Sequence, residues 1–142
     1  MNMSFREKST WISLVTTLFI FGYYFTEAFP ALSDGDADSM KIFGLFIGVI
    51  IGVVVLQVLL HGALAIAFRK EAEKGDDERD KLFELRATRN AYFLLVLGVC
   101  ATGAGMLLTS SPFVMANIIL FFFVLSEIAG FITQLFYHRR RF

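Results

Sequence analysis

Four long apolar blocks constrain this sequence more than any other feature. They cover residues 11–29, 41–60, 91–110 and 113–137, and each is about as long as the ~20 residues that an α-helix needs to cross a bilayer. Hydrophobic residues make up 56% of the chain, whereas a soluble domain has about 45–50%. The sequence therefore predicts an all-α membrane protein, with one domain over residues 1–142 that forms a four-helix transmembrane bundle.

The first block follows a short start that carries Arg6 and Lys8, as a signal peptide would. Its apolar run is longer than the ~7–15 residues of a signal core, and Ala28-Phe29-Pro30 is a poor cleavage site. We therefore expect a retained membrane helix that ends just before Pro30, where proline commonly stops a helix.

The second apolar block continues beyond the length that a bilayer requires. Residues 41–60 suffice for the span, and we expect the same helix to extend out of the membrane as far as Lys74, where Gly75 ends it. A charged helix over residues 77–90 then leads directly into the third span. The two extramembrane arms have similar lengths, which predicts an antiparallel helical hairpin that extends the second and third spans.

Positive charges indicate the orientation of the chain. With four spans, both termini and the hairpin share one side, and of the 13 Lys and Arg residues only Lys41 lies on the other. Membrane proteins keep such charges in their cytoplasmic loops. The N-terminus, the hairpin and the C-terminus are therefore predicted to be cytoplasmic.

The hairpin and the third span resemble a known type of protein. The residues that carry the resemblance are Asp77-Glu78-Arg79-Asp80 and Leu85-Arg86-Ala87-Thr88-Arg89-Asn90-Ala91-Tyr92. They resemble a family of small prokaryotic membrane proteins of unknown function, which look like four-span chains with a DERD-type motif before the third span. The resemblance implies the inner membrane of a prokaryote. It implies no activity and supplies no catalytic residue.

Glu127 is the most informative polar residue, because it lies near the middle of the last span. A charged group there costs about 2.5–3.5 kcal/mol on insertion scales, and such residues are often functional. Gln134 lies seven residues on and shares its helix face, while Gly130 leaves room for a close neighbour. One hypothesis makes Glu127 a proton-carrying or cation-binding carboxylate. The other makes it a paired or protonated group that locks helix packing.

Three further polar residues lie in or near the spans. His61 and Gln57 are one turn apart at the inner edge of the second span, and histidine changes charge near physiological pH. His61 is interpreted as a structural residue or a pH sensor, and a pair between His61 and Glu127 is a further hypothesis. Glu27, near the outer end of the first span, is interpreted as a solvated anchor.

The sequence predicts no metal site and no cofactor. His61 and His138 are the only histidines, and their arrangement has no ligand spacing. The single cysteine, Cys100, lies inside an apolar block and is interpreted as a packing residue.

The charged arm is interpreted as a solvated or protein-docking face. Its carboxylates alternate with basic side chains, which favours ion pairs along the helix over a metal or phosphate site. Arg86 and Arg89 lie beside the inner leaflet, where basic clusters favour anionic lipid. The expected interaction residues are Asp77, Glu78, Arg79, Asp80, Arg86, Arg89 and Asn90.

Glycines at spacing four form a row on the second span: Gly44, Gly48 and Gly52. Such rows let two helix backbones approach closely. The partner is either another span or a second copy of the chain. The third span offers a small-residue surface of its own, which comprises Gly98, Ala101, Thr102 and Gly105.

No motif of a serine hydrolase, a nucleotide-binding loop, a zinc protease or a dinucleotide-binding enzyme occurs. The net charge of +0 gives no bias toward nucleic acid. We therefore expect a small non-enzymatic inner-membrane protein that assembles as a homodimer, or with a membrane or cytoplasmic partner, and presents the hairpin. The alternative is a small proton- or cation-coupled transporter with Glu127 in the pathway. An enzyme acting on lipid is the weakest hypothesis.

Overall fold

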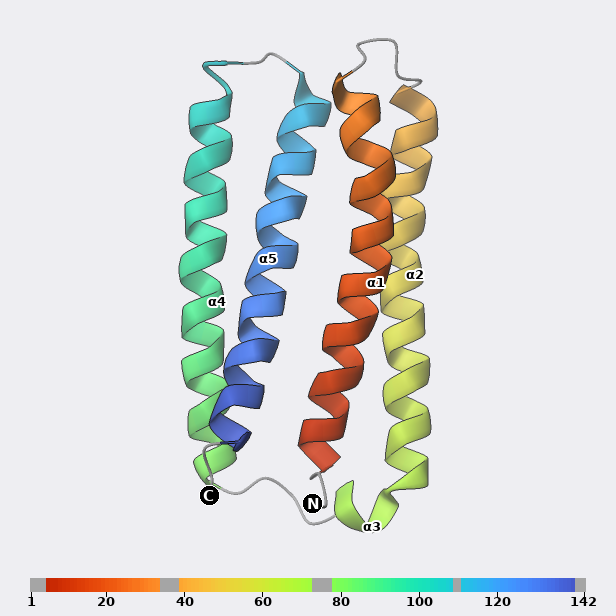
Figure 1. Cartoon of the computed structure of the whole chain (residues 1–142), viewed down its shortest axis with the longest axis vertical. Helices are drawn as coiled ribbons and strands as arrows, with labels where there is room; N and C mark the ends of the chain where they lie inside the picture. Colours follow the sequence, from red (N-terminus) through yellow and green to blue (C-terminus); the bar gives the residue numbers. More distant parts are fainter. Residues whose placement is uncertain (1–4, 34–38, 73–77, 109–110, 140–142) are drawn as a thin grey trace. The chain divides into compact units, whose positions relative to one another are not determined.

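The structure is a computed structural model that describes residues 5–33, 39–72, 78–108 and 111–139 (Figure 1). Its helices are α1 (Phe5–Ser33), α2 (Ser39–Ala67), α3 (Arg69–Ala72), α4 (Glu78–Gly105) and α5 (Pro112–Arg139). Within the described ranges every element is a helix or a turn, so the all-α prediction is confirmed.

Three of the described helices contain a segment that is long and apolar enough to cross a membrane. These segments are Phe5–Pro30, Phe43–Ala67 and Pro112–Arg139. They confirm the membrane class. The charged first part of α4 reaches Asn90, and its apolar part begins at Ala91 and ends with the helix at Gly105. That part is shorter than the ~20 residues of a full span, so a span through α4 remains a prediction.

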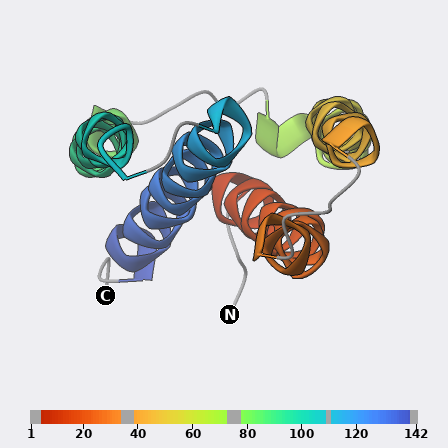
Figure 2. The same cartoon turned by 90° about the horizontal axis from the view of Figure 1, so that it is seen from above.

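The chain divides into two compact units, Met1–Asp77 and Glu78–Phe142. In the first unit α1 packs against α2, and in the second α4 packs against α5. The helices of each pair are antiparallel neighbours (Figures 1 and 2). The backbones of α4 and α5 run close together over more of their length than those of α1 and α2.

Small residues of α4 allow the close contact with α5. Ala87 is fully buried, and Gly98 faces Phe122 so closely that a Cβ added at Gly98 would lie 2.7 Å from the ring carbon Cγ. At the other end of the contact, Gly130 of α5 faces Ala91. The small-residue surface that the sequence indicated on the third span therefore packs against the fourth.

The α1–α2 contact relies on larger and more polar side chains. Tyr24 of α1 is fully buried, and its ring meets Phe46 of α2 edge-on at a centroid distance of 6.3 Å. Among the described side chains of α2, the buried apolar ones are Val49 and Leu64. Most of the remaining α2 surface consists of exposed apolar side chains.

The predicted end of the first span before Pro30 is wrong, because α1 includes Pro30 and continues to Ser33. Proline keeps a helical φ, and its cost is the hydrogen bond that its nitrogen cannot donate four residues back. That acceptor belongs to Thr26, which is exposed. The helix tolerates Pro30 there because only its last turn follows.

The predicted continuation of the second helix to Lys74 is also wrong. Helix α2 ends at Ala67, Phe68 lies in a turn, and α3 is a separate segment of 4 residues. The Lys8 ammonium lies 3.7 Å from the centre of the Phe68 ring, a cation–π contact that favours the turn. Lys74 and Gly75 lie outside the described residues.

The third helix ends earlier than predicted, at Gly105 instead of residue 110. Two i→i−3 hydrogen bonds, from Leu107 to Ala104 and from Leu108 to Gly105, tighten the chain after the helix. The arms of the predicted hairpin belong to different units, each described on its own, so the hairpin stays a prediction.

Candidate functional site

A polar cluster joins α1 to α2 inside otherwise apolar segments. Ser13 Oγ lies 3.1 Å from His61 Nε2, and the Gln57 side chain donates a 3.3 Å hydrogen bond to Thr17 Oγ1. Ser13 and Thr17 are only 5% and 3% exposed. The structure thus brings two predicted site residues, His61 and Gln57, together with two hydroxyls.

Helix periodicity explains why these four side chains meet. Residues four apart lie on the same helix face, one turn from each other. Ser13 and Thr17 have this spacing on α1, and Gln57 and His61 have it on α2. Because the two helices run antiparallel, Ser13 faces His61 and Thr17 faces Gln57. The two hydrogen bonds are therefore consecutive rungs between the helices.

The hydrogen bonds of His61 determine where its neutral ring carries the proton. Nδ1 lies 2.8 Å from the backbone carbonyl oxygen of Gln57, and a carbonyl only accepts, so Nδ1 is the donor. In the neutral ring Nε2 is then an acceptor, and the Ser13 hydroxyl donates to it. If Nε2 gains a proton, the same hydroxyl oxygen can accept. The contact therefore suits both charge states of His61.

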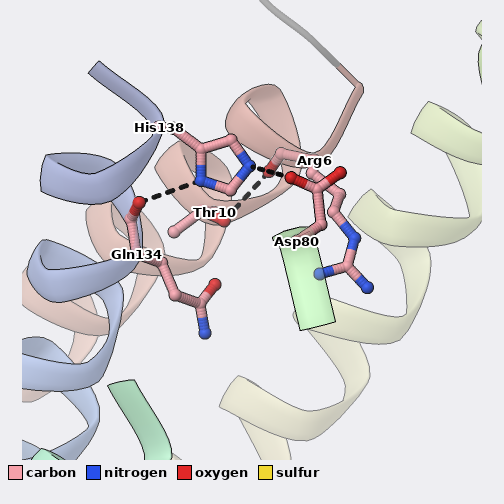
Figure 3. Close-up of polar contacts among 5 residues, drawn as sticks. All are labelled: Arg6, Thr10, Asp80, Gln134 and His138. Carbon is pink, nitrogen blue, oxygen red and sulfur yellow. Dashed lines mark hydrogen bonds and ion pairs between the residues drawn. The ribbon is translucent and has the colours of Figure 1, made fainter. Parts of the chain in front are cut away.

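A second histidine cluster lies in the other unit, where α5 ends beside the start of α4. His138 Nδ1 is 2.9 Å from the backbone carbonyl oxygen of Gln134, and His138 Nε2 is 3.6 Å from Asp80 Oδ1. The two side chains are only 6% and 14% exposed. Figure 3 shows the imidazole ring between the Gln134 carbonyl and the Asp80 carboxylate.

Aromatic rings cover the second cluster. Phe83 of α4 stacks on Tyr137 of α5 at a centroid distance of 5.2 Å and meets the His138 ring edge-on at 6.0 Å. The Arg86 guanidinium lies 5.6 Å from the centre of the Tyr137 ring. These contacts shield the histidine from water and hold the ends of the two helices together.

Figure 3 also draws Arg6 and Thr10 of α1, which belong to the first unit. There the Thr10 hydroxyl donates a 2.9 Å hydrogen bond to the backbone carbonyl of Arg6. Thr10 is buried, and with Ser13 and Thr17 it continues the row of hydroxyls along one face of α1.

Glu127 lies on α5 and is half-buried. Among the described residues, none forms a hydrogen bond or an ion pair with its carboxyl group. Glu127 and His61 belong to different units, so the hypothesis of a pair between them stays untested. Glu27 is exposed near the end of α1.

The described charged side chains of the arm are exposed except at one position. Glu78, Arg86, Arg89 and Asn90 are exposed, whereas Asp80 is half-buried and faces His138. Asp77 and the Arg79 side chain lie outside the described part of the chain.

The glycine row of α2 is open in the structure. A Cβ added at Gly44, Gly48 or Gly52 would have no neighbour within 4 Å. Helix α1 therefore does not pack on this row, and the closest glycine contact of the described chain is that of Gly98.

Sequence reasoning missed Ser13, Thr17 and His138 as members of polar clusters. One signal was present: both histidines follow a glutamine by four residues, in Gln57-Val-Leu-Leu-His61 and Gln134-Leu-Phe-Tyr-His138. In each case the backbone carbonyl of that glutamine holds Nδ1 of the histidine.

The described residues contain no group of three or more His, Cys, Asp or Glu side chains that could hold a metal ion. Comparisons with protein-family models, curated proteins and solved structures find no match for this chain. The family resemblance of the charged segment therefore stays a prediction.

Proposed function

We propose that this chain is a small, non-enzymatic protein of a prokaryotic inner membrane that assembles with itself or with a partner. The proposed topology has four spans, cytoplasmic termini and a charged helical hairpin in the cytoplasm. The observation that carries the proposal is the surface of α2, which is mostly apolar and, beyond the side that packs on α1, exposed.

The burial of the spans supports this proposal. Only 6% of the most apolar segment of α2 is buried, against 28% for α5. A helix that is hydrophobic all round suits the interior of a membrane. The open row at Gly44, Gly48 and Gly52 adds a surface on which a second helix backbone can approach closely. Lipid chains fill such a groove less well than a matching helix does.

The span of this topology that the three apolar helices do not supply is the third in chain order, and it runs through α4. Its apolar part is short for a span, but Met106–Leu108 extend the apolar stretch beyond the end of the helix. A bilayer adapts to a short span by thinning locally, at a cost of fractions of a kcal/mol per Å. Arg86 and Arg89, both exposed at the start of this stretch, suit the phosphates of anionic lipid.

Self-association in native membranes tests the assembly proposal. We would cross-link membranes that contain the natural chain, Gly48→Leu or the matched control Gly62→Leu. Both glycines lie on α2 with open space around them, but Gly62 is outside the row. We expect a dimer that Gly48→Leu weakens by about tenfold, the size of a typical interhelical contact, and that Gly62→Leu leaves intact. Equal effects of the two variants, or no dimer in the natural chain, would argue against the proposal.

Transport of protons or cations is the second candidate function, favoured by the intramembrane position of Glu127 and by the absence of a described partner for its carboxyl group. Liposomes under an imposed pH gradient would compare the natural chain with Glu127→Gln and with the control Glu27→Gln. Flux that is lost only in Glu127→Gln supports transport. If none of the three folded proteins produces a flux, the result argues against transport and favours a packing role for Glu127.

A further inference from the structure

We propose that Arg86 and Arg89 of α4 bind the phosphate group of an anionic phospholipid, at the level where α5 ends beside α4. The site rests on the membrane topology of the proposed function, but it does not depend on self-assembly. It also sets the depth of the charged arm, whose last two turns, residues 83–90, then lie among the lipid headgroups instead of in the cytoplasm.

The register between α4 and α5 indicates this depth. Gly130 of α5 faces Ala91, where the apolar part of α4 begins. Tyr137 of α5 stacks on Phe83 of α4. The stretch of α4 between these two contacts therefore runs alongside residues 130–137 of α5. That segment contains no charged residue, and it belongs to a helix that is apolar enough to cross a membrane.

The lengths of the two helices agree with this depth. Helices α4 and α5 have 28 residues each, or about 42 Å, and a bilayer with its headgroups is about 40–45 Å thick. Arg86 lies 19 residues before the end of α4 at Gly105, which is about 28 Å along the helix axis. A hydrocarbon core is about 30 Å thick. Arg86 therefore reaches the inner headgroups, and Arg89, one turn deeper, reaches them with its long side chain.

The two guanidinium groups are suited to an anion. Arg86 and Arg89 are exposed, and residues three apart are neighbours on a helix. Among the described residues, no carboxylate forms an ion pair with either group. The Arg86 guanidinium lies 5.6 Å from the centre of the Tyr137 ring, a contact that orients the group without neutralising it. A planar guanidinium binds two oxygens of one phosphate at once.

Apolar side chains at the same level identify the anion as a lipid. Leu85 of α4 and Ile132 of α5 are exposed, and Leu85 lies one turn before Arg89 on the same side of the helix. Tyr92, one turn deeper than Arg89, is exposed as well, and tyrosine is enriched at the membrane interface. Free phosphate would leave these side chains in water, whereas a phospholipid brings acyl chains with its phosphate. Two unpaired positive charges favour an anionic lipid over a zwitterionic one.

Lipid binding to the whole protein in detergent tests the site. Native mass spectrometry would give the dissociation constant of the first bound phosphatidylglycerol. We expect this constant to rise about fivefold in Arg86→Gln and about fivefold in Arg89→Gln, which corresponds to the ~1 kcal/mol of a basic side chain at an anionic surface. The control Lys81→Gln changes an exposed lysine of α4, about 7 Å farther out along the axis. Its effect should be less than about twofold, because the attraction falls off with distance from the headgroups.

The site is refuted if Lys81→Gln weakens binding as much as the arginine variants do, or if either arginine variant binds phosphatidylglycerol like the natural chain. Equal affinity of the natural chain for phosphatidylcholine refutes it as well. Displacement of the lipid by inorganic phosphate would identify a site for a soluble anion and would equally overturn the proposal.

A depth measurement in liposomes tests the proposal without changing an arginine. Spin labels would be attached to Leu85→Cys, Lys81→Cys or Val54→Cys, each combined with Cys100→Ser. Val54 is exposed in the middle of α2 and is the reference for the hydrocarbon core. We expect the label at residue 85 to meet a water-soluble nickel complex less often than the label at residue 81, and more often than the label at residue 54. Equal access at residues 85 and 81, with residue 54 shielded, refutes the lipid site alone. Full access at all three positions refutes the membrane topology itself.

Discussion

The two helix pairs each hold a histidine near the end of an apolar helix, but they set different groups opposite its Nε2 atom. In the α1–α2 pair that group is the Ser13 hydroxyl, and in the α4–α5 pair it is the Asp80 carboxylate. A hydroxyl both donates and accepts, whereas an ionised carboxylate only accepts. The first contact therefore tolerates either charge state of its histidine, and the second is favourable in one state only.

The same two pairs differ in how their backbones approach. In the α4–α5 pair Gly98 lies directly against Phe122, whereas the glycine row of α2 faces open space. Glycine thus permits a close approach of two helices, but the approach occurs only where a side chain of the neighbouring helix, such as Phe122, fills the space beside the glycine. A glycine pattern alone does not locate the contact.

The largest expected effect is the loss of stability in Gly98→Ala, which tests the close contact between α4 and α5. In Gly98→Ala the new Cβ collides with Phe122, and overpacking of this kind costs about 1–3 kcal/mol. Thermal unfolding in detergent would measure the loss of stability. Gly103→Ala, on the same helix with open space around it, is the control and should not destabilise. If both variants behave alike, the α4–α5 contact is not as close as described.

A smaller loss is expected when the hydroxyl opposite His61 is removed. Ser13→Ala leaves Nε2 of a part-buried ring without its donor, and interhelical hydrogen bonds in membranes contribute about 0.6–2 kcal/mol. The control is Thr26→Val, because Thr26 is exposed and bonds only to its own helix at Tyr23. Equal unfolding temperatures for Ser13→Ala and the natural chain would show that the Ser13–His61 hydrogen bond does not stabilise the α1–α2 pair.

The smallest effect concerns the turn that separates α2 from α3. Lys8→Gln removes the cation–π contact with Phe68, which is worth about 0.5–1 kcal/mol at an exposed site. Hydrogen exchange at residues 68–72 should speed up severalfold. Lys70→Gln, which changes an exposed lysine in α3, is the matched control. Faster exchange in Lys70→Gln but not in Lys8→Gln would show that the Lys8–Phe68 contact does not stabilise the turn.

The fold class was predictable because the length of an apolar block is a local property of the sequence. Three described helices fulfil that prediction, and the starts of α2, α4 and α5 lie close to the predicted positions. The errors fall at helix ends. Pro30 sits inside α1, and Phe68 interrupts the second helix, because single contacts and solvent decide where a helix stops.

The candidate site was predictable only in part. His61 and Gln57 attract attention as polar residues in an apolar block, but their partner Ser13 is 48 residues away from His61 in the sequence. That contact depends on the register between two helices, which helix periodicity alone does not define. The sequence drew attention to His138 only in excluding a metal site, and it assigned Asp80 to a solvated or docking face; the structure places the two side chains together.

The measurement that tests the central contrast most directly is ¹⁵N spectroscopy of both neutral imidazole rings in lipid, in the natural chain and in Asp80→Asn. The account predicts that Nδ1 keeps its proton in both rings, held by the Gln57 and Gln134 carbonyls. It also predicts that Asp80→Asn changes the ¹⁵N chemical shift of Nε2 in His138 and leaves that of His61 unchanged. A neutral His61 or His138 with its proton on Nε2, or a response to Asp80→Asn shared by both rings, would contradict it.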